Sequence, residues 1–314
     1  MKEKREGLDY WIHWQVFVCA LVIVAPAIAA AIVLSRYRDE QLRPSDVWTP
    51  CWKKIHPICL LVYRGLVVLI MSCLLTRFLL VDGAFAFYFY TQWTFTLVIV
   101  YFAIGTVISA HGCWMHFKQG AQGVTQDEEA NEFLKREIQE TDHATLNFRE
   151  NNAIRSRDKE VKEKRAGILG YTMQIIYQIC AGAVMLTDIV FWCLLAPFMS
   201  DHFSVNALMF CMHSLNFVFL LLDTLLNSLP FPWFRMAYFV FFSCIYVVFQ
   251  WILHACGFTW WPYPFLELST PWAPAWYIAM ALVHVPCYFF YWLVVKAKNS
   301  FLPKWFPHAY VRSY

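Results

Sequence analysis

Seven long apolar stretches constrain the fold of this chain more than any other feature of its sequence. A helix needs about 20 predominantly apolar residues to cross a hydrocarbon core that is ~30 Å thick. Stretches of at least that length occupy residues 11–35, 55–81, 87–111, 168–199, 203–229, 234–257 and 275–296. We therefore predict an all-α fold, a polytopic transmembrane helix bundle of about seven spans.

The composition agrees with this class. Of the 314 residues, 60% are hydrophobic and only 15% are charged, which excludes an ordinary soluble domain. The first apolar run is too long for a signal peptide and lacks a small-residue cleavage site, so we expect it to be the first span. No nucleic-acid signature is present, and no nucleic-acid partner is predicted.

Most of the 11 cysteines lie within the apolar runs, without the paired spacing of a disulfide framework. We interpret them as small residues that face lipid or the core. They are Cys19, Cys59, Cys73, Cys180, Cys193, Cys211, Cys244 and Cys287.

Basic residues predict the orientation of the bundle, because cytoplasmic loops carry the excess of Lys and Arg. With seven spans, one side receives the basic residues of 36–54, 118–165, 235 and 296–312, whereas the other receives only Lys2, Lys4 and Arg5. We expect a lumenal or extracellular N-terminus, a cytoplasmic C-terminus, and residence in the endoplasmic reticulum or the plasma membrane.

Two regions follow from the spacing of the runs. Residues 1–54 are expected to form an N-terminal span and a cytoplasmic loop, and residues 55–314 a six-span membrane domain with a charged cytoplasmic loop at 113–167. This loop mixes both signs of charge, and Glu132 with Arg136 has the i, i+4 spacing of a solvated helix. A solvated, helical or partly disordered linker is favoured over a regulatory or partner-binding segment.

Polar residues at one depth of the membrane suggest a site. At ~1.5 Å per residue, the side chains of Thr94, Thr96, His213, Asp188 and His284 all lie roughly 10–16 Å from the lumenal side. Ionisable groups are costly at such depth and are commonly functional. Four spans therefore contribute polar groups to one layer.

Acyl transfer is the chemistry that this layer favours. An imidazole can remove the proton of a threonine hydroxyl, and a carboxylate can orient the imidazole. Thr96 or Thr94 would be the nucleophile, His213 the base and Asp188 the orienting group. Zinc binding by His213, His284 and Asp188 is the alternative, but no metal-binding spacing supports it, so neither a metal nor a cofactor is predicted.

Structural roles compete with these functions. A threonine in a span is often bonded to the carbonyl one turn earlier, and a histidine can serve helix packing. His284, which precedes Pro286 by two residues, can donate a hydrogen bond across the local break in its helix.

Charged partners are also available within the spans. Arg77 lies near the lumenal end of its span and could pair with Asp188 or extend its charge outward. For Arg64 and Asp223, which lie nearer the cytoplasmic side, we predict a mutual structural salt bridge.

Four sequence elements carry a family resemblance: "TQWTFTLVIVYF" from Thr91, "DIVFWCLLAPF" from Asp188, "NALMFCMHSLNFVFLLLD" from Asn206 and "WILHACGFTWWPYPFLE" from Trp251. Together they resemble the androgen-induced-gene family of integral membrane proteins and its rolling-stone-like branch. The resemblance covers roughly spans two to seven, so the fold would be a six-span family core plus an N-terminal span.

The resemblance implies an intramembrane threonine hydrolase of fatty acid esters of hydroxy fatty acids, with a membrane lipid as substrate. It assigns the histidine to His213. The family threonine follows a tryptophan by four residues, a position that Leu97 holds here, and Thr96 is the nearest hydroxyl. Trp93, Thr94 and His284 are the expected substrate-binding residues. The rolling-stone-like branch implies instead a non-enzymatic protein of membrane organisation, lipid sensing or cell fusion.

Overall fold

The structure, a computed structural model, describes residues 8–37, 42–137, 166–198 and 207–311, with side chains described there except at 8, 119–137 and 207. Within these ranges, seven helices are long and apolar enough to cross a membrane. They are α1 (Trp14–Arg36), α3 (Pro57–Asp82), α4 (Tyr90–Glu137), α6 (Ile168–Ile189), α8 (Ala207–Leu226), α9 (Met236–Ala255) and α10 (Ala273–Trp305). The predicted all-α class and the seven spans are confirmed, and the chain is an integral multi-pass membrane protein.

Three spans differ from their predicted bounds. Helix α4 continues without proline to Glu137, so the predicted charged loop at 113–167 begins as helix, and its residues 138–165 lie outside the described ones. Helix α10 continues through Pro286 and Pro303 to Trp305. The fourth span divides into α6, a π-helical segment (Val190–Leu195) and the short helix α7 (Ala196–Phe198).

Local sequence signals place the helix ends. Pro57 occupies the first turn of α3, where its missing N–H costs nothing, and the His56 side chain accepts a hydrogen bond from the Ile58 amide at 3.2 Å. At the other end of α3, Gly83 has a φ of +62°, which a residue with a Cβ rarely adopts.

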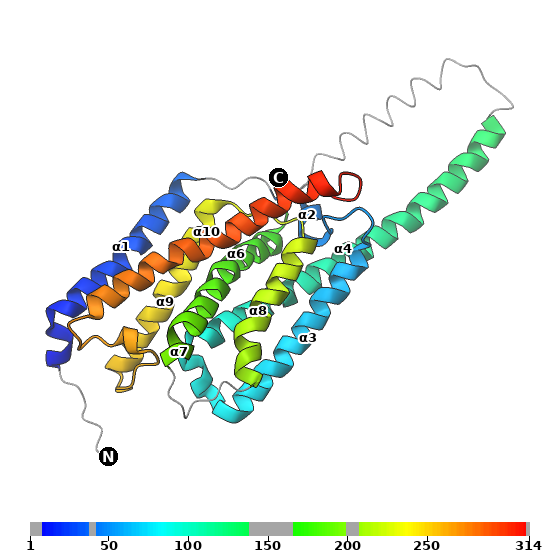
Figure 1. The fold of residues 1–314 in the computed structure, drawn as a ribbon. Helices are drawn as coiled ribbons and strands as arrows, with labels where there is room; N and C mark the ends of the chain where they lie inside the picture. Colours follow the sequence, from blue (N-terminus) through cyan, green and yellow to red (C-terminus); the bar gives the residue numbers. More distant parts are fainter. Residues whose placement is uncertain (1–7, 38–41, 138–165, 199–206, 312–314) are drawn as a thin grey trace.

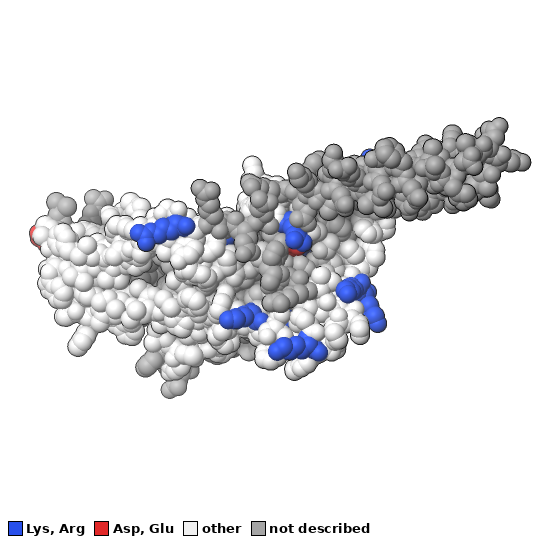
Figure 2. Space-filling view, turned by 90° about the horizontal axis from the view of Figure 1, so that it is seen from above, with Lys and Arg blue, Asp and Glu red and all other residues white. Residues whose placement is uncertain are grey.

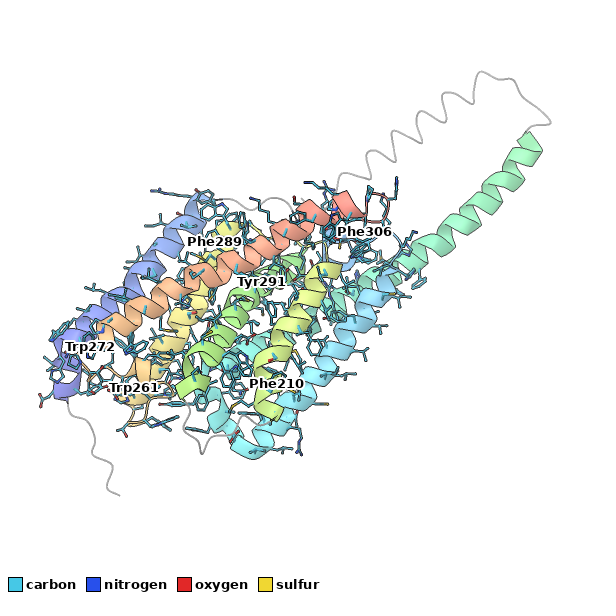
Figure 3. The ribbon with its side chains drawn as sticks, viewed as in Figure 1. Phe210, Trp261, Trp272, Phe289, Tyr291 and Phe306 are labelled. Carbon is cyan, nitrogen blue, oxygen red and sulfur yellow. The ribbon has the colours of Figure 1, made fainter. Side chains whose placement is uncertain are left out.

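The spans alternate in direction, and α6 occupies the middle of the bundle (Figure 1). It packs against α4, α8, α9 and α10, whereas α1 lies at one edge against α9 and α10, and α3 packs mainly against α4. Close packing is possible at Gly182 of α6, where an added Cβ would lie 2.5 Å from the Phe239 ring of α9. In Figure 3, Tyr291 of α10 lies over the middle of the bundle, near α6 and α8.

The outer surface of the bundle is apolar. Leu21, Ile28, Leu69, Ile245 and Leu282 are among the many large apolar side chains that are exposed. Figure 2 shows a face that is mostly free of charge, with Lys and Arg as scattered groups. Because lipid tails can cover such a surface, exposure here is consistent with membrane insertion.

The end of the bundle where α1 begins is closed by chain segments without long helices. We call it the N-terminal end; it carries three 3₁₀ turns (Leu8–Ile12, Gly83–Tyr88 and Pro264–Leu266). In the connection between α9 and α10, Trp260 and Trp272 are exposed, as in an aromatic belt at a membrane interface, whereas Trp261 and Tyr263 are buried.

The opposite end, which we call the basic end, is tied together by the segment after α1. Helix α2 (Pro44–Trp48) leads into residues 50–53, which run between the end of α8 and the C-terminal segment. The Cys51 amide donates to the Leu226 carbonyl at 2.8 Å, and the Val311 amide donates to the Cys51 carbonyl at 2.7 Å. Residues from three distant parts of the sequence therefore meet there.

Candidate functional site

A cavity of about 90 Å³ lies near the N-terminal end, where the middle helices meet. Its walls come from α4, α6, the π-helical segment, α8, α9 and α10, and Tyr263, Phe265 and Leu266 close it from the loop after α9. Most of the lining is apolar. Its polar side chains are the two histidines His213 and His284, the hydroxyls of Thr91, Thr187 and Ser243, and three tyrosines.

His213 is held in the cavity wall by an aromatic ring. The imidazole on α8 stacks on Phe191 with ring centroids 3.7 Å apart and planes inclined by only 5°. His213 is 7% exposed, and its Nδ1 is buried without a hydrogen-bond partner among the described residues. Phe191 belongs to the π-helical segment, a distortion often found at functional sites.

His284 also lines the cavity, and one of its two ring nitrogens, Nδ1, has a hydrogen-bond partner. Nδ1 lies 2.7 Å from the Met280 carbonyl one turn earlier in α10, and Nε2 is buried without a partner in the described structure. The expected donation across a proline break is therefore wrong in detail. Pro286 removes the donor for the Leu282 carbonyl, not for the Met280 carbonyl that His284 contacts.

The α4 residues predicted from the sequence lie outside the cavity lining. Thr94 is fully buried, and the hydroxyl oxygens of Thr94 and Thr96 are both buried without partners among the described residues. Trp93 donates its indole N–H to the Phe87 carbonyl at 2.8 Å. No described hydrogen bond joins Thr94 or Thr96 to His213.

Asp188 follows Thr187 at the end of α6 and does not line the cavity either. Its Oδ1 is buried and has no hydrogen-bond partner among the described residues. Arg77 is exposed, and no described ion pair joins it to Asp188. The structure thus brings His213 and His284 to one cavity and leaves Thr96 and Asp188 outside its walls.

Three hydroxyls of the lining were missed from the sequence. Thr187 donates to the Val184 carbonyl at 2.9 Å, and the Ser243 hydroxyl lies 2.8 Å from that of Tyr90. Thr91 follows Tyr90, whose amide donates to the Tyr263 hydroxyl at 3.1 Å, and burial raises the pKa of Tyr263 to about 12. Only one of these residues had a signal in the sequence: Thr187 immediately precedes Asp188, which had already been predicted as a site residue.

A second polar cluster lies toward the basic end. Arg64 donates from Nε to Asp223 Oδ1 at 2.9 Å, and both side chains are fully buried, which confirms the predicted salt bridge. Tyr101 and Asn227 donate to the other carboxylate oxygen. Lys298 donates to two carbonyls at the end of α8, each at 2.9 Å. Arg64 Nη1 also donates to the Val47 carbonyl and to the Ser109 hydroxyl, whereas Nη2 is buried without a partner among the described residues.

The residues considered as zinc ligands do not gather. Among the side chains that the structure describes, no three His, Cys, Asp or Glu residues lie close enough together to hold a metal ion. His213 and His284 share a cavity, but Asp188 is not part of its lining.

The fold and this cavity define a class, a seven-helix integral membrane protein with an apolar internal pocket that contains two imidazoles. Comparison with protein-family models, with curated proteins and with solved structures finds no match for this chain.

Proposed function

We propose that the protein is an intramembrane hydrolase of lipid esters in which His213 acts as the base. The observation that supports this proposal is the placement of His213: its imidazole is stacked on Phe191 and has an unpartnered Nδ1, in the wall of a cavity whose surface is mostly apolar. A lipid acyl chain matches such walls, and an imidazole held in one plane is suited to proton transfer.

The reaction would follow the two-step course of acyl transfer. His213 takes the proton of a threonine hydroxyl, the oxygen attacks the ester carbonyl, and the alcohol leaves with that proton. Water, deprotonated by His213, then cleaves the acyl-threonine ester, which releases the fatty acid and restores the hydroxyl.

Two threonines compete for the role of nucleophile. The family resemblance favours Thr96, and the shared depth predicted from the sequence adds Asp188 as the orienting carboxylate. The cavity lining favours Thr187, which lies four residues before the Phe191 ring that stacks on His213. Thr187 would have to turn its hydroxyl away from the Val184 carbonyl to reach a substrate.

Substitution of each threonine by the isosteric valine tests the proposal. In purified protein in lipid nanodiscs, we expect His213→Gln and one of Thr187→Val and Thr96→Val to lower lipid-ester turnover and fluorophosphonate labelling by at least about 10²-fold. Thr76→Val is the matched control, because Thr76 is exposed on α3. Full activity of His213→Gln, or of both threonine variants, would contradict the hydrolase.

A non-enzymatic role in lipid sensing, membrane organisation or cell fusion is the second candidate. It is favoured by the lack of a described hydrogen bond between His213 and any side-chain hydroxyl. In that case the cavity binds lipid without turnover, and His213→Gln alters lipid binding or thermal stability only.

The distribution of charge supports an orientation as well. The basic end would face the cytoplasm, because it carries the Lys and Arg residues that flank the spans. The cavity would then open toward the lumenal or extracellular half of an endoplasmic reticulum or plasma membrane.

A further inference from the structure

A second cavity of about 100 Å³ lies beside the first, beneath the N-terminal span. Val22, Ile23 and Pro26 of α1 form one wall, and the others come from α9, α10 and residues 265–266 of the loop between them. His284 lines both cavities. The two cavities adjoin, since they also share Ser243, Val247, Phe265, Leu266 and Met280, but α1 lines only the second.

The polar side chains of this second cavity already have hydrogen-bond partners, with one exception. The Tyr277 hydroxyl donates to a backbone carbonyl and accepts from an indole N–H. Ser243 is paired with Tyr90, and the Cys244 thiol donates to the Ile23 carbonyl at 3.6 Å. What is left is His284.

The tautomer of His284 follows from its contact with the backbone. A carbonyl oxygen can only accept, so Nδ1, at 2.7 Å from the Met280 carbonyl, carries the proton. The neutral ring then presents Nε2 as a bare acceptor, which is buried and unpartnered among the described residues. Such a group is unfavourable unless a donor reaches it.

The geometry points to a binding site for a neutral, long-chain alcohol, whose hydroxyl donates to His284 Nε2 and whose apolar chain enters the cavity beneath α1. A water molecule needs two to four polar partners, and His284 Nε2 is the one polar side-chain atom of this lining that is recorded as unpartnered among the described residues. A carboxylate would meet neither a donor nor a cation, since no Lys or Arg is among the lining residues. A long-chain alcohol fits because it has a single hydroxyl donor for His284 Nε2 and an apolar chain for the apolar walls.

This inference goes beyond the proposed hydrolase and does not depend on it. Alcohol binding at His284 involves neither His213 nor a threonine, so it can hold in a protein that never turns over an ester. Loss of hydrolysis and loss of alcohol binding are therefore separate outcomes.

Two isomeric ligands test the site. 1-Decanol and methyl nonyl ether have the same atoms, but only the alcohol can donate a hydrogen bond. We expect the full chain in phosphatidylcholine nanodiscs to bind decanol about fivefold more tightly than the ether, as measured by native mass spectrometry and by the ligand-induced thermal shift.

Four variants locate the effect. His284→Phe keeps a ring against Phe239, whose centroid lies 4.7 Å from that of His284, but removes the acceptor; His284→Gln keeps an acceptor. We expect the preference for alcohol to vanish in the first and persist in the second. Ala281→Phe fills the cavity and should weaken decanol binding, whereas Leu282→Phe, at an exposed neighbouring position, should not.

The outcomes are decisive in either direction. Equal affinity of the wild-type chain for alcohol and ether, or an unchanged preference in His284→Phe, would overturn the assignment. Unaltered decanol binding in Ala281→Phe would show that the alcohol lies elsewhere and would overturn it too. Thermal unfolding without ligand establishes that each variant is folded.

Discussion

Two aspartates within the spans have opposite surroundings. Asp223 accepts hydrogen bonds from Arg64, Tyr101 and Asn227, so its charge is balanced and its oxygens are occupied. Asp188 has a buried oxygen without a described partner. A saturated carboxylate is suited to holding helices together, whereas an unsatisfied one remains available to a substrate or a proton.

The buried pair gives a prediction about stability. Asp223→Ala leaves the Arg64 guanidinium buried without its counter-charge, and we expect the free energy of unfolding in detergent to fall by about 3–5 kcal/mol. Asp82→Ala, at an exposed position, is the matched control and should change the free energy of unfolding little.

A double substitution separates the charge from the packing. Replacing both residues with apolar ones, Arg64→Met with Asp223→Leu, should recover much of the lost stability, because no unpaired charge remains. A double variant as unstable as Asp223→Ala would mean that the surrounding hydrogen bonds, not the ion pair, dominate.

Among the helices, α6 depends most on a small residue. Gly182→Ala would place a Cβ 2.5 Å from the Phe239 ring, so α6 and α9 must separate, at a cost of about 1–3 kcal/mol. Gly65→Ala on α3 is the matched control, since its nearest neighbour would be 3.9 Å away. Thermal unfolding midpoints compare the two, and equal midpoints would refute tight packing at Gly182.

The sequence was sufficient to predict the helices but not the directions of their side chains. Length and hydropathy identify a span, and counting residues estimates depth; His213 and His284, which are predicted at one depth, do line one cavity. Depth says nothing about rotation about the helix axis, and each residue turns by about 100°. Thr96 therefore does not line the cavity despite its predicted depth, and Thr187 was overlooked.

The π-helical segment is a second reason why the sequence did not predict which side chains of the fourth span line the cavity. It inserts an extra residue into the turn and so changes which side chains of the fourth span face α8. No apolar periodicity in "DIVFWCLLAPF" reveals this change, and the stacking of Phe191 on His213 depends on it. The Arg64–Asp223 pair was predictable because two opposite charges in apolar runs have few other solutions.

At the scale of the whole molecule, the reactivity of one cysteine at each end of the bundle tests the structure and its orientation. Cys256 is exposed after α9 at the N-terminal end, whereas Cys51 is buried at the basic end, and burial raises the pKa of the Cys51 thiol. We expect a membrane-impermeant maleimide to label Cys256 in the folded protein and to leave Cys51 unlabelled, as mapped by peptide mass spectrometry.

The dependence on pH has a definite sign. Because burial disfavours the thiolate, raising the pH from about 7 to about 9 should not make Cys51 reactive, although ordinary exposed thiols gain thiolate over that interval. Unfolding in dodecyl sulfate should expose it. In intact cells, labelling of Cys256 from outside would support the proposed orientation, and its protection until the membrane is permeabilised would indicate an internal membrane or the reverse orientation.

The Arg64–Asp223 pair also constrains the order of biosynthesis. The two residues are 159 positions apart, and a ribosome adds about 5–20 residues per second. Arg64 is therefore synthesised roughly 8–30 s before its counter-ion, and α3 can enter the membrane within that interval. During that interval the nascent α3 carries an unneutralised cation in the bilayer, so assembly of the first three spans stays incomplete until α8 is synthesised.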